Sequence, residues 1–136
     1  MKQELQDQLF KKYPEIFIQK DLPSSQTCMN WGIECGDGWF NIIDTLCESI
    51  QHHVTYGKIE QIEAAQVKEK FGGLRFYVDG EDDYVRGLIR MAESMSFRTC
   101  DVCSSPGQPL GPGWIRTSCE THRNKQYKNE ISEPEV

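Results

Sequence analysis

Hydrophobic residues recur at helical spacing in two long segments of the chain. In residues 39–50 the apolar side chains share one helical face, with Asp37 as a candidate N-cap and Gly57 as a candidate helix end. The second segment runs from Tyr84 to Phe97 and carries the stripe Val85, Leu88, Ile89, Ala92 and Met95. Both segments are therefore predicted to be helices that bury one face.

Shorter patterns surround these helices. Residues 3–12 form an amphipathic pattern that ends at Tyr13-Pro14, because proline disfavours further helix. Acidic residues at 81–83 precede the second long helix, where a helix N-terminus favours negative charge. Residues 113–118 are a candidate strand near the C-terminus.

Between the two long helices, the segment QVKEKFGGLRFYV (residues 66–78) has the period of two that is typical of strands. The pair Gly72-Gly73 can adopt the positive φ angles of a tight hairpin turn. With these two glycines as the turn, the expected cross-strand pairs are Phe71–Leu74, Lys70–Arg75, Glu69–Phe76, Lys68–Tyr77 and Val67–Val78.

The same alternation separates basic from apolar residues on the two faces of the hairpin. The basic face is predicted to hold Gln66, Lys68, Lys70, Arg75 and Tyr77, and the apolar face Val67, Phe71, Leu74, Phe76 and Val78. Like charges opposite one another destabilise a sheet, so a negative group is expected over Lys70 and Arg75. Three sources of that charge are open: the acidic residues at 79–83 or near the C-terminus, an external phosphate-bearing ligand, or an acidic protein partner.

Glu69 falls on the apolar face, where a carboxylate without a partner would be costly. It is expected to reach the sheet edge, to pair with a buried donor, or to mark a pocket.

The clearest chemical signal is the spacing of three cysteines and a histidine. Two residues separate Cys100 from Cys103, and after fifteen intervening residues Cys119 and His122 repeat this spacing. Two such ligand pairs are typical of a tetrahedral zinc (Zn) site of the treble-clef or ribbon-like kind, with the second pair on the first turn of a terminal helix. Four protein ligands would close the coordination sphere, so the predicted zinc is structural and no catalytic residue is assigned.

The other cysteines and the paired histidines have no such spacing. Cys28, Cys35 and Cys47 lack a close partner and are expected to be buried thiols. His52 and His53 are adjacent on a helix and point about 100° apart, so they do not chelate one ion together.

Composition and charge narrow the function classes. At 136 residues the chain is long enough for one domain that hides roughly 68% of its unfolded surface. A net charge of -6 argues against bulk nucleic-acid binding, although a local basic patch can still attract phosphate. The sequence shows no signal peptide and no membrane-spanning run, which predicts a cytoplasmic protein without a membrane partner.

Together these elements predict an α+β fold in which helices pack on a small antiparallel hairpin or sheet. The expected organisation is an α+β core over residues 1–98, a zinc-binding module over 99–123 packed on that core, and a polar tail over 124–136.

Four motifs in one order, CGDGWFNIIDTLC, QVKEKFGGLRFYV, CDVC and GWIRTSCETH, resemble those of a family of small bacteriophage and prophage zinc-binding proteins. The motifs span residues 35–122, most of the chain. The resemblance implies a protein of the host bacterial cytoplasm with a role in host takeover, counter-defence or a phage metabolic task.

The expected function is binding without catalysis. The partner would be a host protein or an anionic nucleotide-like small molecule, and the candidate ligand-binding residues are Lys68, Lys70, Arg75, Tyr77, Trp31 and Trp39. The alternative is an enzyme acting on a phosphate-containing substrate, with Glu69 or Asp37 as general base. That alternative has neither a phosphate-loop signature nor a nucleophile with an adjacent base in its favour.

Overall fold

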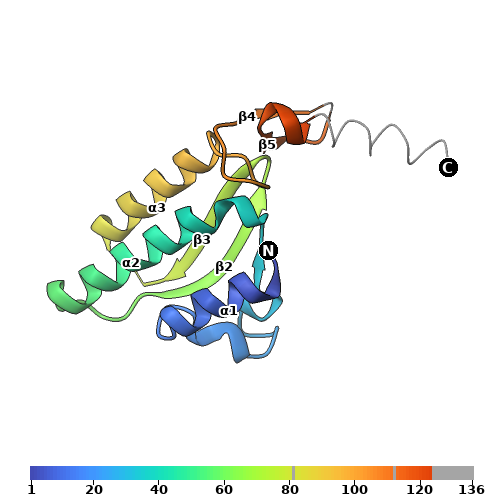
Figure 1. The fold of residues 1–136 in the computed structure, drawn as a ribbon. Coiled ribbons are helices and arrows are strands. Elements are labelled where there is room, and N and C mark those ends of the chain that lie inside the picture. Colours follow the sequence, from blue (N-terminus) through green and yellow to red (C-terminus); the bar gives the residue numbers. More distant parts are fainter. Residues whose placement is uncertain (81, 112, 124–136) are drawn as a thin grey trace.

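The computed structural model describes residues 1–80, 82–111 and 113–123 and has the predicted α+β fold (Figure 1). The helices are α1 (Gln3–Lys12), α2 (Phe40–Gly57) and α3 (Asp83–Ser96), with short 3₁₀ turns η1 (Ile18–Asp21), η2 (Met29–Trp31) and η3 (Asp37–Trp39). The strands are β1 (Ile33–Glu34), β2 (Glu63–Lys70), β3 (Gly73–Asp79), β4 (Gln108–Leu110) and β5 (Arg116–Ser118).

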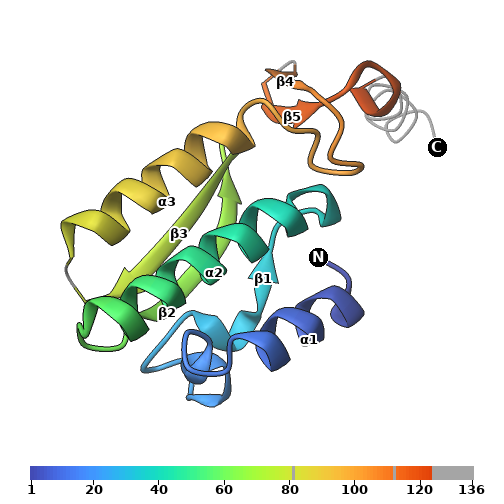
Figure 2. The same cartoon turned by 60° about the vertical axis from the view of Figure 1, so that its left-hand side comes forward.

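The larger sheet has the strand order β1-β2-β3, and the helices cover one of its faces (Figure 1, Figure 2). β2 and β3 form the predicted antiparallel hairpin, whereas β1 lies parallel to β2 with Ile33 opposite Val67. A parallel pair needs a crossover connection, and α2 supplies it. The sequence pattern did not indicate β1 as a sheet strand, because two residues carry no readable period. In the described part of the chain no helix lies over the opposite face, which carries Lys68, Arg75 and Tyr77 and which we call the open face (Figure 1, Figure 2).

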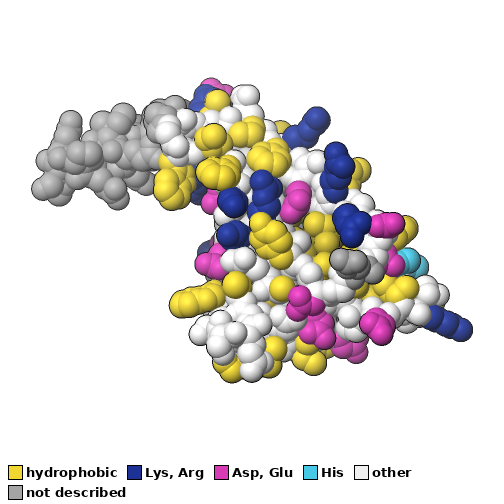
Figure 3. Space-filling view, turned by 180° about the vertical axis from the view of Figure 1, so that it is seen from behind, with side chains coloured by type: hydrophobic (Ala, Val, Ile, Leu, Met, Phe, Trp, Pro, Cys, Tyr) yellow, Lys and Arg dark blue, Asp and Glu magenta, His cyan; other side chains and the backbone are white. Residues whose placement is uncertain are grey.

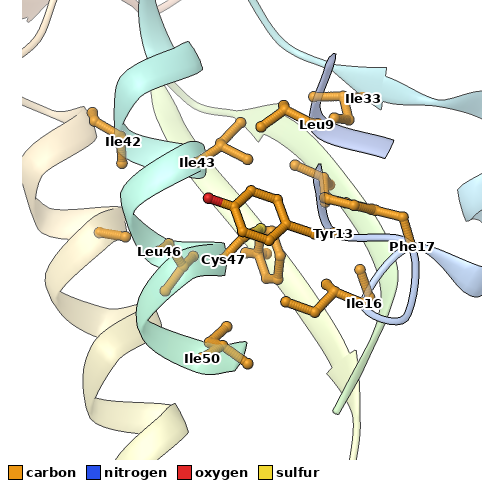
Figure 4. Packing of buried hydrophobic residues seen from close by; sticks show 14 of the residues in the cluster. Leu9, Tyr13, Ile16, Phe17, Ile33, Ile42, Ile43, Leu46, Cys47 and Ile50 are labelled. Atoms are coloured by element: carbon orange, nitrogen blue, oxygen red, sulfur yellow. The ribbon is translucent and has the colours of Figure 1, made fainter. Parts of the chain in front are cut away.

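The core lies between the helices and the covered face of the sheet (Figure 4). Its fully buried side chains include Leu9, Ile16 and Phe17 from the N-terminal segment, Ile43 and Ile50 from α2, and Ile33, Val67 and Leu74 from the sheet. The apolar stripe predicted for residues 39–50 is confirmed, since Trp39, just before α2, and Ile42, Ile43, Leu46 and Ile50 within it are all buried.

One polar contact ties the end of α1 to α2. The Tyr13 hydroxyl donates to Asp44 Oδ1 at 2.6 Å, and Lys12 Nζ lies 3.0 Å from the same oxygen. Burial alone would raise the pKa of Asp44, but the hydrogen bonds from Tyr13 and Lys12 outweigh it and lower that pKa. The ionised carboxylate therefore favours the folded state at neutral pH.

The ends of α2 differ from the prediction. The helix begins at Phe40, because Asp37 opens a 3₁₀ turn and accepts a hydrogen bond from Lys2 N at 2.7 Å instead of capping the helix. Its last residue is Gly57, but the residue with left-handed backbone is Lys58, with φ 54°.

The predicted α3 is confirmed, with one exception in its stripe. Asp82 caps it by accepting a hydrogen bond from Val85 N at 2.9 Å. Met95, predicted to join the buried stripe, is 48% exposed. Glu81, predicted to lie at the helix start, is outside the described residues.

The hairpin turn is displaced by one residue from its predicted position. The turn residues are Phe71 and Gly72, whose φ angles of 52° and 84° are both positive, as a type I′ turn requires. Gly73 instead begins β3 and pairs with Lys70. A Cβ atom added to Gly73 would lie 2.2 Å from the Phe97 ring, so this glycine allows close packing.

Moving the turn by one residue moves every predicted pair by two positions. The observed pairs are Lys70–Gly73, Glu69–Leu74, Lys68–Arg75, Val67–Phe76 and Gln66–Tyr77. Since the displacement is even, each strand residue stays on its predicted face. The predicted faces are thus confirmed and the predicted pairs are wrong. Phe71 leaves the apolar face because it lies in the turn, where it is 70% exposed.

The predicted polar tail, residues 124–136, lies outside the described residues. No helix in the described ranges is both long enough and apolar enough to cross a membrane.

Candidate metal centre

The four predicted metal ligands lie in the segment that follows α3, beyond one end of the sheet (Figure 1). Cys100 and Cys103 belong to a turn in which Ser104 N donates to Cys100 O at 3.1 Å. The strands β4 and β5 return the chain, and Cys119 directly follows β5. A helical turn starts there, with Arg123 N donating to Cys119 O at 2.9 Å. This order of turn, hairpin and helix start is treble-clef-like, as predicted.

The ligand atoms of Cys100, Cys103, Cys119 and His122 all lie within 4.8 Å of one another. Cys103 Sγ is 3.7 Å from Cys119 Sγ, and His122 Nδ1 is 3.2 Å from Cys119 Sγ and 3.6 Å from Cys100 Sγ. Tetrahedral zinc with ordinary bond lengths separates two sulfur ligands by about 3.8 Å, and sulfur from nitrogen by about 3.6 Å. The Cys3His group could therefore hold a metal ion at its centre.

The surroundings of the sulfur atoms differ. Burial raises the pKa of Cys100. Cys103 is exposed, and hydrogen bonds from the Ser105 side chain and backbone lower its pKa to about 6. Of these two thiols, Cys103 therefore loses its proton more readily. The thiolate is the form of cysteine that binds a metal.

Two glycines bring the core backbone against the metal-binding turn. A Cβ atom added to Gly36 would lie 1.9 Å from Asp101 O, and one added to Gly38 would lie 2.1 Å from Cys100 O. Gly38 N also donates to Asp101 O at 2.9 Å. Neither position can carry a side chain unless the two backbones move apart.

Trp39 reinforces this contact from the core side. It is fully buried, and its indole Nε1 donates to Thr99 O at 2.9 Å. Ser104 Oγ completes the contact by donating to Gly38 O at 2.6 Å. The prediction that Trp39 binds a ligand is wrong, because its side chain offers no surface to one.

Inside the metal module (residues 99–123), an ion pair between the buried Asp101 and the partly exposed Arg116 joins the metal-binding turn to β5. Asp101 is only 3% exposed, and its two carboxylate oxygens lie 3.1 Å and 3.2 Å from Arg116 Nε and Nη2. Asp101 N donates to Thr117 O at 3.0 Å. This bidentate pair compensates the carboxylate for the loss of water.

The hairpin turn of the core packs on the same module. Thr117 is fully buried, and its Oγ1 donates to Gly72 O at 2.5 Å. A Cβ atom added to Gly72 would lie 3.0 Å from Ile115 Cγ2. The two glycine-containing motifs of the core, CGDGW and KFGGLR, therefore both contact the Cys3His module. The sequence reasoning missed this role, although the close spacing of Gly36 and Gly38 before Trp39 was its signal.

The predicted basic residues share the open face of the sheet. Lys68 pairs with Arg75 across β2 and β3, and Lys70 and Tyr77 lie further along the same face. None of the three cations makes an ion pair with a described acidic residue. Figure 3 shows Lys and Arg side chains gathered on this face below a group of hydrophobic side chains.

The described acidic residues near β3 have other partners. Asp79 accepts from Gln19 Nε2 at 2.6 Å, Asp82 lies 3.2 Å from His53 Nε2, and Asp83 pairs with Arg86. The predicted covering of the basic face by these three residues is therefore wrong. Glu81 and the C-terminal acids, proposed with them, are outside the described residues.

Trp31 and the candidate bases lie elsewhere. Trp31 is 69% exposed and lines a hollow with residues of α1 and η1, to which no described hairpin residue contributes. Glu69 Oε1 accepts a hydrogen bond from Gly72 N at 2.8 Å, so its carboxylate is satisfied by the turn. Asp37 is held by Lys2 N.

Two of the three remaining cysteines match the prediction of buried thiols. Cys35 and Cys47 are buried, and burial raises the pKa of Cys35 to about 12 and that of Cys47 further. Cys28 is exposed, so its prediction is wrong. His53 stacks on Tyr84 at 4.2 Å between ring centroids, away from any cluster of metal ligands among the described residues.

The chain matches no protein-family model, no curated protein and no solved structure. The resemblance to phage proteins therefore stays a prediction.

Proposed function

We propose that this chain is a zinc-stabilised binding protein that holds an anionic, phosphate-bearing ligand on the open face of its sheet. The observation that carries the proposal is the grouping of Lys68, Lys70 and Arg75 on that face with no ion pair to a described acidic residue. The exposed Glu34 lies opposite Lys68 in β1 without forming an ion pair with it, so an anion or solvent ions would balance most of the charge of these three cations.

Zinc is the metal that we propose for the Cys3His group. Three thiolates and an imidazole are ligands that zinc prefers, and four protein ligands leave no open position for water. The metal would hold Cys100 and Cys103 against the helix start at Cys119, and through Gly38 and Thr117 it would also brace the core.

Catalysis is not part of the proposal. Glu69 and Asp37, the candidate general bases, each accept a hydrogen bond from a backbone N–H. No nucleophile paired with a base adjoins the basic face among the described residues. The resemblance to phage proteins supports a setting in an infected bacterium, where the ligand could belong to the host or to its defences.

Charge reversal tests the binding proposal. Titration calorimetry with inorganic tripolyphosphate should detect binding that weakens with added salt, because exposed charges are screened within about 8 Å at physiological ionic strength. The Lys70→Glu, Arg75→Glu double variant should lose this binding and keep its melting temperature, since exposed charges contribute little to stability.

A matched control carries the same charge change elsewhere. Lys11→Glu with Lys58→Glu reverses two exposed lysines outside the sheet and should bind tripolyphosphate nearly as well as the parent. Equal loss in both double variants would mean that net charge alone drives binding. A lower melting temperature with unchanged binding in the hairpin variant would make the basic face architectural, and either result would reject the proposal.

A further inference from the structure

We infer that the anionic ligand is single-stranded nucleic acid, with one base held between Phe71 and Trp114 and the phosphates following the basic face. This inference rests on the proposed function and names its ligand.

A hollow of about 260 Å³ lies where the hairpin turn meets the metal module, lined by Glu69, Lys70, Phe71, Gly113, Trp114 and Ile115. Phe71 is 70% exposed and Trp114 is 68% exposed. Two large aromatic side chains left in water beside a hollow are favourable sites for stacking a planar ring. Stacking of a base on an aromatic side chain is favourable for any sequence, because every base has a π-face.

A cation lies at the border of this hollow. Lys70 Nζ is 5.7 Å from the centroid of the Phe71 ring, and Lys70 also belongs to the basic face. The hollow and the basic face are therefore continuous, so a base in the hollow would place its phosphate beside Lys70.

The basic face continues from the hollow towards a third exposed aromatic residue. Tyr77, which is 43% exposed, pairs with Gln66, four residues along β2 from Lys70. Four residues of strand span about 13 Å. Lys68 and Arg75 lie opposite each other between these ends. A single nucleotide reaches one end of this row, whereas a short chain of nucleotides can stack at both ends with its phosphates on the cations between them.

The same arrangement disfavours duplex DNA. Bases in a duplex are stacked on one another and cannot enter the hollow, and the net charge of -6 opposes binding through phosphates alone. Glu34, exposed on the open face opposite Lys68 in β1, would further repel a phosphate backbone lying across the whole sheet. A bound single strand is therefore expected to lie along the β2–β3 hairpin and not across β1.

The metal module positions one side of the hollow. Trp114 and Ile115 precede β5, which is held to the hairpin turn by the Thr117 Oγ1 hydrogen bond to Gly72 O. Phe71 and Trp114 thus keep their separation only while the module stays docked, and we expect removal of the metal with a chelator to weaken binding of nucleic acid.

The probe for the test is a fluorescein-labelled ten-residue oligothymidylate, followed by anisotropy at low salt. Phe71→Ala and Trp114→Ala should each weaken binding about tenfold, the loss of one stacked base. Trp31→Ala is the matched control, because Trp31 is as exposed as Trp114 but lines the other hollow, and it should bind like the parent. In a Trp31→Phe variant, unlabelled oligothymidylate should quench the remaining fluorescence, since Trp39 is buried and Trp114 is not.

Each other outcome decides between the two proposals. If the Phe71→Ala and Trp114→Ala proteins both bind like the parent while Lys70→Glu with Arg75→Glu abolishes binding, the proposed anion binding by the basic face stands and the base-stacking inference fails. If the double charge reversal changes neither oligothymidylate nor tripolyphosphate binding, the proposed function itself fails. If tripolyphosphate or a ten-base-pair duplex competes as well as the single strand, phosphates alone are recognised and the inference is overturned.

Discussion

Replacing Gly38 with alanine should separate the metal module from the core. An added Cβ would lie 2.1 Å from Cys100 O and 2.6 Å from the carbonyl carbon of Asp101, both of which are backbone atoms that cannot rotate away. The backbone of one segment must therefore move. The same movement would stretch the hydrogen bonds from Gly38 N to Asp101 O and from Trp39 Nε1 to Thr99 O.

The cost follows from these contacts. Overpacking costs about 2 kcal/mol, and the two hydrogen bonds contribute about 1 kcal/mol each. Alanine lowers the conformational entropy of the unfolded chain relative to glycine, which offsets about 1 kcal/mol of this cost. The free energy of unfolding should therefore fall by about 3 kcal/mol, which lowers the melting temperature of a domain of this size by about 12 °C.

The assay is thermal unfolding followed by circular dichroism with zinc present, together with competition for zinc by a chromogenic chelator. Gly87→Ala is the matched control, because Gly87 is exposed on α3 and an added Cβ would meet nothing within 4 Å. That variant should gain up to about 1 kcal/mol, since alanine favours helix over glycine. A Gly38→Ala protein that melts within about 2 °C of the parent would refute the close backbone contact.

Two further predictions concern the metal and one ion pair. Reduced protein should contain one zinc ion per chain. Either a chelator or the Cys119→Ser substitution should unfold residues 99–123 before the rest of the chain, which hydrogen exchange would detect as early loss of amide protection in that segment. Purified protein that contains no metal and whose melting temperature does not change with chelator would contradict this prediction. The lowered pKa of Asp44 means that its stabilising effect is complete above its unfolded pKa, near 3.9, and is lost as pH falls through the lower folded value. Acid unfolding of Tyr13→Phe should therefore begin at a higher pH than that of the parent, because the phenol donor at 2.6 Å is gone, and identical acid transitions would contradict the assignment.

Local pattern was enough to predict the helices, the two faces of the hairpin and the residues of the Cys3His group. Helical and strand periods are properties of neighbouring residues, so α2, α3 and the segregation of Lys68 from Val67 follow from the order of residues alone. The ligand spacing is likewise local, because each pair closes within one turn of chain.

Contacts between distant segments decided the rest. By local preference, Gly72 and Gly73 could form the turn. Gly73 instead packs against the Phe97 ring as the first residue of β3, so Phe71 and Gly72 form the turn. The sequence predicted Trp39 to be a ligand-binding residue, but in the fold it is buried and its indole Nε1 donates to Thr99 O. The strand β1 exists only because β2 lies beside it. In each case the deciding atoms are far apart in the chain, so no window of sequence contains them, and only packing brings them into contact.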